Sequence, residues 1–417
     1  MMKIKVLGLA CCLAASIGAA TQSHAATEQN KSSSAVLLQG FHWNSHQYGW
    51  YNIMKGKASD MQSLGITHVW FPPPSDAASS EGYLPRQLNK LDSNYGSKSQ
   101  LKSAITALNN KGIKAVADIV VNHRVGTTNW GDFTNPTWGS WSVTRDDEWT
   151  GSTGNWDTGD GYAAARDLDH TNTGVQDGIK SWMNNVLKDV GFSGWRYDYS
   201  KGYSPYYAKV YHDGTNPNFC VGEVWTNLYY NDVDAHRKQL MDYVDGTQGS
   251  CAAFDFTTKG LLNKALSSNE YWRLKDGSGK PAGGIGWWPQ KMVTFVDNHD
   301  TGPSQSCGVG QNHWPVPCDK VMQGYAYILT HPGIPTVYWP HVYDWGLRGE
   351  IKNLIDIRKR AGLTSTSSVN VKASQNGLYA AIIGGKVAMK IGPNNWSPGS
   401  GWQLSTFGNN FAVWEKK

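Results

Sequence analysis

The sequence predicts an α/β fold, a (β/α)8 TIM barrel with an excursion domain after the third strand and a C-terminal antiparallel β domain. Short apolar runs rich in β-branched and aromatic residues alternate with stretches whose apolar residues recur three or four positions apart. This alternation repeats eight times over about 320 residues, which is the pattern of a closed parallel barrel. After residue 362 the helical pattern stops, and short apolar runs are separated by Gly, Asn and Pro.

Eight runs are expected to form the barrel strands, and several helices between them have clear apolar faces. The strands are expected at residues 35–41, 67–71, 114–121, 194–199, 219–225, 252–256, 292–296 and 335–339. The clearest helices are expected at residues 99–109, 175–190, 319–329 and 350–360.

One connection is far longer than the others. About fifty residues rich in Gly, Asp, Trp, Thr and Asn follow the third strand, and a structureless loop of that length is improbable. We therefore expect an excursion domain at 122–168, between two parts of the barrel at 26–121 and 169–358. A tail domain at 359–417 should contain strands at 378–383, 386–391 and 411–415.

The N-terminal residues predict export. Lys3 and Lys5 precede an apolar run at 6–20, and Ser23-His24-Ala25 supplies small residues for cleavage near Ala25. Residues 1–25 are therefore expected to be a signal peptide. No later run approaches the ~20 apolar residues of a membrane span, so we expect a secreted, soluble chain with no membrane partner. We also expect the mature chain to be a monomer.

Charge and composition argue against a nucleic-acid-binding protein. The formal net charge of +5 falls to +3 when Lys3 and Lys5 leave with the signal peptide. Charged residues make up 17% of the chain, below the usual ~25%, whereas 20 Trp and 20 Tyr far exceed ordinary use. Flat aromatic rings without compensating charge suit the faces of sugars, although many of these rings could equally belong to the core.

Four cysteines remain after the signal peptide is removed, namely Cys220, Cys251, Cys307 and Cys318. In an exported chain such cysteines are usually oxidised, so two disulfides are expected. Four cysteines permit three pairings, and their spacing does not choose among them.

Polar residues gather where the predicted strands end, and in a barrel these ends meet at one mouth. Three of the strands end in a carboxylate, accompanied by two His and an Arg. The residues are Asn122 and His123 after the third strand, Arg196, Asp198 and Lys201 at the fourth, Glu223 and Trp225 after the fifth, and His299 and Asp300 after the seventh. Such convergence predicts a catalytic site rather than a set of unrelated caps and ion pairs.

Two carboxylates facing each other across a pocket suit the cleavage of an acetal, because one can attack the sugar carbon while the other protonates the departing oxygen. Arg196 lies two residues before Asp198 on the same strand face and could hold that carboxylate ionised. Glu223 follows an apolar run, where burial favours the neutral acid. Asp198 is therefore the expected nucleophile and Glu223 the expected acid.

Four segments resemble, in order, the signature regions of the α-amylase family of glycoside hydrolases: D-I-V-V-N-H at 118–123, G-W-R-Y-D at 194–198, G-E-V-W at 222–225 and F-V-D-N-H-D at 295–300. Q-G-F-H-W at 39–43, G-W-W-P at 286–289 and F-A-V-W-E-K at 411–416 resemble the plant-type α-amylases, such as the cereal seed enzymes. The resemblance implies a secreted α-amylase that cleaves internal α-1,4-glucosidic bonds of starch and maltooligosaccharides by a retaining double displacement.

The resemblance also implies roles for individual residues. Asp300 would stabilise the transition state beside the catalytic pair, and His123 and His299 would hydrogen-bond the same sugar ring. Tyr83 would stack on that ring, while Arg196, Lys201 and Trp225 complete the substrate-binding set, the last two on the leaving-group side.

At least one structural Ca²⁺ is implied as well, because oxygen-rich segments could order an excursion domain with little apolar core. Its ligands would be Asn122, Asp157, Asp167 and the carbonyls of Asp160 and Gly202. Trp287, Trp288 and Tyr379 resemble surface starch-binding positions. Cys220 and Cys251 match a cysteine pair of maltotetraose-forming amylases, which leaves Cys307 to pair with Cys318.

Three other functions stay open. An exo-acting amylase would release a fixed short maltooligosaccharide, and the short loop at 72–83 argues for endo attack instead. A metal-dependent barrel hydrolase would use His123, His299 and Asp300 as ligands, but neither His lies in a paired-His spacing. A silent starch-binding protein is disfavoured because all three carboxylates are present.

Overall fold

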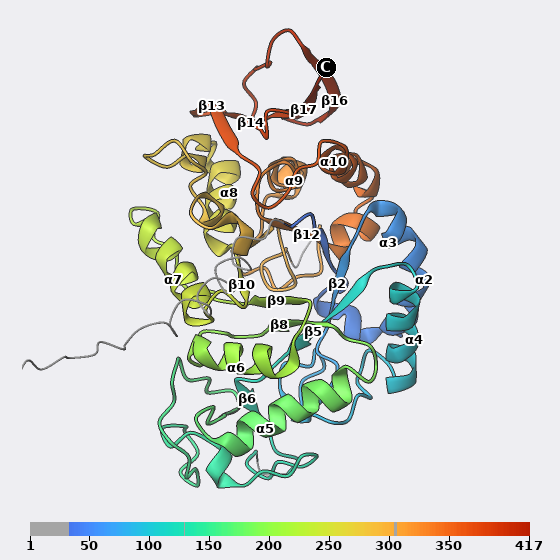
Figure 1. Cartoon of the computed structure of the whole chain (residues 1–417), viewed down its shortest axis with the longest axis vertical. Coiled ribbons are helices and arrows are strands. Elements are labelled where there is room, and N and C mark those ends of the chain that lie inside the picture. The colour runs from blue at the N-terminus through green and yellow to red at the C-terminus, as the bar shows by residue number, and fades with distance from the viewer. Residues whose placement is uncertain (1–32, 129, 304–306) are drawn as a thin grey trace, which may run out of the picture.

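Eight parallel strands close into a barrel in the computed structural model, which describes residues 33–128, 130–303 and 307–417 (Figure 1). Their order around the barrel is β1-β12-β11-β10-β9-β8-β5-β2. They are β1 (Leu37–Gln39), β2 (His68–Phe71), β5 (Lys114–Ile119), β8 (Gly194–Tyr197), β9 (Phe219–Gly222), β10 (Ala252–Phe254), β11 (Met292–Phe295) and β12 (Ile334–Tyr338). All eight predicted runs form strands, and the predicted barrel is confirmed. The signal peptide predicted at 1–25 lies outside the described residues.

Several strands are shorter at their C-terminal ends than predicted, because the last residues of these runs leave the barrel wall. The backbone N–H of Asp198 still donates to Ile119 (3.1 Å), and that of Glu223 donates to Tyr197 (3.0 Å). Each of these carboxylates therefore lies one residue beyond the end of its strand. There the backbone is still held by hydrogen bonds to the neighbouring strand, and the side chain can reach the mouth of the barrel.

Helices surround the barrel. They are α2 (Trp50–Gly56), α3 (Ala58–Leu64), α4 (Lys98–Asn109), α5 (Thr173–Trp182), α6 (Pro205–Thr215), α7 (Val233–Gly246), α8 (Phe256–Ser268), α9 (Val321–Thr330) and α10 (Arg348–Arg360). The helix expected at 175–190 is α5 followed by a π-helical turn, Met183–Leu187. Within the described ranges, none of the helices has the length and apolar character needed to cross a membrane.

The long connection after β5 contains little regular structure. Its two short strands, β6 (His123–Arg124) and β7 (Arg166–Asp167), pair with each other, and β3 (Asp76–Ala77) pairs with β4 (Pro85–Gln87) nearby in the chain. The buried guanidinium of Arg124 donates to the carbonyls of Arg86, Thr134 and Pro136. This side chain therefore links the start of the long connection to a later part of it and to β4.

The C-terminal segment forms one antiparallel sheet in the order β13-β14-β15-β17-β16. The three predicted tail strands are β14 (Leu378–Ile383), β15 (Val387–Ile391) and β17 (Phe411–Lys416). The sequence did not predict β13 (Val369–Gln375) or β16 (Trp402–Gly408). Both are edge strands with few buried side chains, so they lack the apolar run that marks a central strand.

Helix α9 lies between the barrel and this sheet, and all of its ten residues are buried. The Gln323 side chain is fully buried, and its Oε1 accepts hydrogen bonds from the Tyr271 hydroxyl (2.6 Å) and the Gly392 N–H (3.1 Å). One polar side chain of the helix thus links the sheet to the barrel layer.

The prediction that Tyr379 contributes to a starch-binding surface is wrong. Tyr379 on β14 is 0% exposed, and its hydroxyl lies 2.9 Å from Nε2 of His331, just beyond α9. Its ring packs against Tyr327 of α9. The residue faces the barrel rather than solvent, so it stabilises the contact between the two layers.

Candidate active site

One guanidinium organises the carboxylates at the barrel mouth. Nη1 of Arg196, on β8, lies 2.8 Å from Oδ1 of Asp118 and 2.7 Å from Oδ1 of Asp198. Its Nη2 lies 2.9 Å from Oε1 of Glu223, an ion-pair contact not aligned as a hydrogen bond. Arg196 is 1% exposed, so these charges interact in a medium that screens them little.

Asp118 is a member of this cluster that sequence reasoning did not single out. It is fully buried on β5, and its Oδ2 accepts hydrogen bonds from the Tyr83 hydroxyl (2.8 Å) and from Nε1 of Trp70 (3.0 Å). The Arg196 guanidinium also lies over the Trp70 ring, 4.8 Å from its centroid. Asp118 therefore fixes both the guanidinium and Tyr83 and is a positioning residue.

Burial raises the pKa values of the carboxyl groups at this mouth. The pKa of Asp198 rises to about 6 because burial outweighs the opposing charge of Arg196. The pKa of Glu223 is raised by burial, with Asp198 adding to the effect and Arg196 opposing it. Burial and the neighbouring Glu223 raise the pKa of Asp300 to about 7. Several carboxyls around one cation give the site a negative field that favours a developing positive charge.

Asp300 lies on the turn that follows β11. Its backbone N–H donates to Oδ1 of Asn298 (3.0 Å), and its Oδ1 accepts a hydrogen bond from the side chain of Gln311. Nε2 of His299 lies 3.3 Å from Oδ2 of Asp300. Gln311 has no motif around it, so sequence reasoning did not find this contact.

His299 is held between aromatic rings and a glutamine. Its Nδ1 lies 2.9 Å from Nε2 of Gln39, and its ring stacks near Tyr83 (5.3 Å) and Trp43 (6.1 Å between centroids). Burial and the charge of Arg196 lower the pKa of His299 well below its usual value. The imidazole is thus neutral near pH 7 and can act as a hydrogen-bonding group without adding charge.

His123 is also buried and neutral, because burial lowers its pKa to about 4. Its Nε2 donates to the backbone carbonyl of Tyr83 (2.8 Å), and its ring stacks on Tyr162 at 4.1 Å. His123 therefore fixes the backbone of Tyr83 and supports an aromatic ring from the excursion.

Beside Glu223 lies an open cavity of about 540 Å³ lined by Lys201, Trp225 and His313, among others. The Trp225 ring stacks on Phe256 with 5.3 Å between centroids, so one of its faces is held in a fixed orientation. The structure brings both predicted leaving-group residues, Lys201 and Trp225, to the same side of Glu223.

Comparison with known proteins identifies the family to which the barrel and its C-terminal sheet belong. The model described as "Alpha amylase, catalytic domain" matches residues 54–238, and that of the "Alpha-amylase C-terminal beta-sheet domain" matches residues 360–415. "Probable alpha-amylase 2" of Arabidopsis thaliana is 44% identical over 397 residues, covering 91% of this chain and 94% of that protein. The chain belongs to the α-amylase family. It is a glycoside hydrolase.

Other proteins resemble the chain more distantly. "Glucan 1,4-alpha-maltotetraohydrolase" of Stutzerimonas stutzeri is 32% identical over 386 residues, covering 86% of this chain and 68% of that protein. A solved Anoxybacillus α-amylase superimposes with a TM-score of 0.66 at 16% identity, covering 92% of this chain and 98% of that one. The structural likeness shows the shared fold.

In this α-amylase-family chain, a buried ion pair supports the turn that carries His299 and Asp300. Nζ of Lys259, on α8, lies 2.6 Å from Oδ1 of Asp297, and both side chains are 0% exposed. Asp297 also accepts hydrogen bonds from the Thr301 hydroxyl (3.2 Å) and the Val316 N–H. The carboxylate that ends the β11 run is thus a structural anchor, and Asp300 is the one that reaches the mouth.

The residues predicted to bind Ca²⁺ come together at the base of the excursion. Nδ2 of Asn122 donates to Oδ1 of Asp167 (3.0 Å), while Oδ1 of Asn122 is buried and has no hydrogen-bond partner among the described residues. A Cβ on Gly202 would lie 2.0 Å from that oxygen, so the Gly202 backbone passes directly beside it. Among the described residues, no group of three or more His, Cys, Asp or Glu is arranged as a metal site.

Asp157 and Asp160 approach the same place from the excursion. Oδ2 of Asp157 is buried and has no hydrogen-bond partner in the part of the chain that the structure describes. The N–H of Asp160 donates to the carbonyl of Lys201 (3.0 Å). Burial raises the pKa of Asp157 to about 6 and that of Asp167 to about 7, with nearby carboxylates adding to both. Orphaned oxygens and uncompensated carboxylates are what a hard cation would satisfy, so the residues fit Ca²⁺.

Trp287 and Trp288 lie between two 3-10 helices, Gly284–Gly286 and Pro289–Lys291, so they do not alternate as residues of a strand would. Trp287 is 44% exposed, and the Arg237 guanidinium lies 4.1 Å from its ring centroid. Trp288 is partly buried against the core. Trp287 is therefore the more accessible of the two rings.

Both predicted disulfides are present. Cys220 on β9 bonds to Cys251 at the start of β10, and Cys307 bonds to Cys318 in the loop after β11. The first joins adjacent barrel strands, and the second closes a local loop on the same side as Asp300.

Proposed function

We propose that this chain is an endo-acting α-amylase that hydrolyses α-1,4-glucosidic bonds of starch and maltooligosaccharides with retention of anomeric configuration. The observation that carries the proposal is the single Arg196 guanidinium in contact with both Asp198 and Glu223. It holds two ionisable carboxyl groups side by side at the mouth of an α-amylase-family barrel, and Asp300 lies near enough to interact electrostatically with both.

The proposed mechanism uses the two carboxyl groups in turn. Asp198 attacks the anomeric carbon while protonated Glu223 gives its proton to the departing glycosidic oxygen, and a covalent glycosyl ester forms on Asp198. Glu223, now a carboxylate, then removes a proton from water, whose oxygen attacks the same carbon and releases Asp198. The raised pKa of Glu223 supports its role as acid, and the negative field around Asp300 favours the oxocarbenium-like transition state.

The remaining site residues are proposed to hold the sugar rings. Tyr83, stacked near His299, offers an aromatic face at the cleavage point. His299 is proposed to hydrogen-bond the ring there. His123, whose Nε2 is engaged by Tyr83, is proposed to act mainly by holding that residue. Lys201 and Trp225 would contact the leaving group.

The test is a product analysis on soluble starch. NMR of the first products should show the α-anomer, and the starting chains should shorten through a mixture of oligosaccharide lengths. Initial release of the β-anomer would contradict the double displacement. Exclusive early release of one short oligosaccharide would instead favour the exo-acting alternative. The similarity to a maltotetraohydrolase is the reason for testing that alternative.

We further propose that Asn122, Asp157, Asp167 and the carbonyls of Asp160 and Gly202 hold a structural Ca²⁺. When bound, the ion would tie the excursion to the barrel and take no part in bond cleavage. A ligand that binds only the folded state stabilises it by about 2.7 kcal/mol at a hundredfold excess over Kd.

Exhaustive chelation should therefore lower the melting temperature, and added Ca²⁺ should restore it. Scanning calorimetry on the same sample before chelation, after chelation and after readdition measures both changes. Mg²⁺ serves as the control ion, because its preference for tight octahedral geometry makes it a poor substitute. An unchanged melting curve after complete removal of calcium would contradict the assignment.

Export and surface adhesion complete the proposal. The predicted signal peptide at 1–25 supports secretion, with a monomer as the proposed working form. Trp287, with Trp288 beside it, is proposed as a platform for starch granules, supported by the exposed ring of Trp287 and its fixed position against Arg237.

A further inference from the structure

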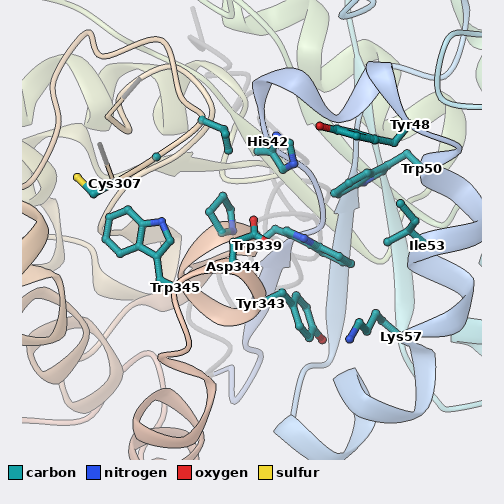
Figure 2. Close-up of a pocket in the computed structure, with 13 residues that line it drawn as sticks. His42, Tyr48, Trp50, Ile53, Lys57, Cys307, Trp339, Tyr343, Asp344 and Trp345 are labelled. Carbon is teal, nitrogen blue, oxygen red and sulfur yellow. The ribbon is translucent and has the colours of Figure 1, made fainter. Parts of the chain in front are cut away.

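A second cavity, of about 760 Å³, lies on the other side of the first βα loop from the catalytic carboxylates. Within that loop, Phe41 and Trp43 pack against His299, while His42 between them lines the cavity. The other walls come from α2, from the segment that follows β12 and from residues 307–309 of the loop after β11, of which Figure 2 labels Cys307. The cavity and the catalytic site thus adjoin the same two loops, those after β1 and after β11, but are lined by different residues.

Aromatic rings form a continuous series along this cavity (Figure 2). The ring of Tyr48 lies 6.4 Å from that of Trp50, and Trp50 lies 4.9 Å from Trp339. Trp339 lies 4.4 Å from Tyr343, which continues the series toward Lys57. At the start of the series Tyr48 is 53% exposed. Trp50 and Trp339 are only 3% and 2% exposed and hold the series in place, so Tyr48 and the half-buried Tyr343 are the rings of this series that offer an accessible face to a ligand.

A few polar groups stand among the rings. His42 is 7% exposed, and its Nδ1 is buried without a hydrogen-bond partner in the part of the chain that the structure describes. Lys57, whose Nζ lies over the Tyr343 ring, and Asp344 also line the cavity, one of each charge. Two opposite charges in an aromatic cavity favour a ligand that is neutral overall and carries hydrogen-bonding groups.

We propose that this cavity binds a segment of α-1,4-glucan, in addition to the segment held at the catalytic site. A pyranose ring presents apolar C–H faces and a rim of hydroxyl groups, and the cavity presents aromatic faces with a few hydrogen-bonding groups. Its volume lies within the ~300 to 1,000 Å³ of ordinary ligand sites. The proposal rests on the proposed function, because a polymeric glucan at the catalytic site is what brings further sugar units to this side of the barrel mouth.

Two-site binding of a defined oligosaccharide tests the inference. Glu223→Gln in the full chain prevents turnover, so titration calorimetry with maltoheptaose can follow binding without cleavage. With Trp287→Ala also present, so that the surface platform proposed above does not contribute, we expect two binding events in this background. Adding Tyr48→Ala should weaken one of them at least fivefold and leave the other unchanged, whereas Tyr48→Phe, which keeps the aromatic face, should retain both.

Two further variants make the test specific. Tyr206→Ala removes an equally exposed tyrosine (54%) on α6, outside this cavity, and should change neither event. Ile53→Arg, from an exposed position of α2 in the cavity wall, should block the same event that Tyr48→Ala weakens. A single event, or two events unchanged by Tyr48→Ala and Ile53→Arg, would overturn the proposal.

The proposed function is tested separately, by measuring whether the chain with Glu223 intact cleaves maltoheptaose. If that chain cleaves maltoheptaose but the cavity variants bind as the parent does, only the second site is wrong. If it does not cleave maltoheptaose at all, the proposed function fails first.

Discussion

Asp198→Asn should abolish nearly all hydrolysis while leaving the fold and substrate binding intact. The amide can still accept a hydrogen bond from Arg196 through its oxygen, but it cannot form the glycosyl ester. We expect kcat to fall about 10⁴-fold, which corresponds to about 5 kcal/mol of lost transition-state stabilisation. Reducing-sugar release measures the loss, and calorimetry with maltoheptaose measures the binding that remains.

The matched control for this loss is Asp189→Asn, which makes the same chemical change at a half-exposed carboxylate. Asp189 pairs with Lys98 and Lys102 at the surface, and such pairs contribute ~0 to 1 kcal/mol. Its activity should match that of the unmodified chain. If Asp198→Asn kept a tenth or more of the activity, Asp198 would not be the nucleophile.

Lys259→Met should destabilise the fold more than any surface substitution. It would leave Asp297 as a fully buried carboxylate without its counter-ion, and breaking a buried pair in this way costs about 3 to 5 kcal/mol. Burial already raises the pKa of Asp297, with Lys259 opposing the change. Chemical denaturation should therefore show a markedly lower midpoint, and activity should fall because Asp297 anchors the turn that carries Asp300.

Two comparisons separate the buried charge from the loss of packing. The double variant Lys259→Met with Asp297→Asn removes the charge but keeps an acceptor for Thr301 and Val316, and should recover much of the stability. Lys238→Met breaks an exposed pair with Asp242 on α7 and should cost about 1 kcal/mol at most. If Lys259→Met proved as mild as Lys238→Met, the ion pair would not be the anchor that we describe.

The barrel could be predicted from the sequence because its strands are buried on both faces and appear as short apolar runs. The contact between Arg196 and Asp198 was predictable for a similar local reason, since alternate residues of a strand share a face. The edge strands β13 and β16 carry polar side chains on exposed positions, so the same criterion did not find them.

Asp118 shows what local pattern cannot supply. It stands inside an apolar run, and its partners Tyr83, Trp70 and Arg196 are 35, 48 and 78 residues away. Tyr379 shows the complementary error: alternation indicates which residues share a face of β14, but not that α9 covers the face that Tyr379 occupies. Both outcomes depend on packing between segments distant in the chain.

The burial of α9 on every side has a consequence for how the molecule is put together. A chain ending before the C-terminal sheet would expose an apolar helix face, and with it the buried Gln323 and His331, to water. We therefore expect the sheet and the barrel to unfold together as one cooperative unit, and not as two independent domains. Exchanging the sheet for the tail of another barrel would require redesigning the outer surface of α9 at the same time.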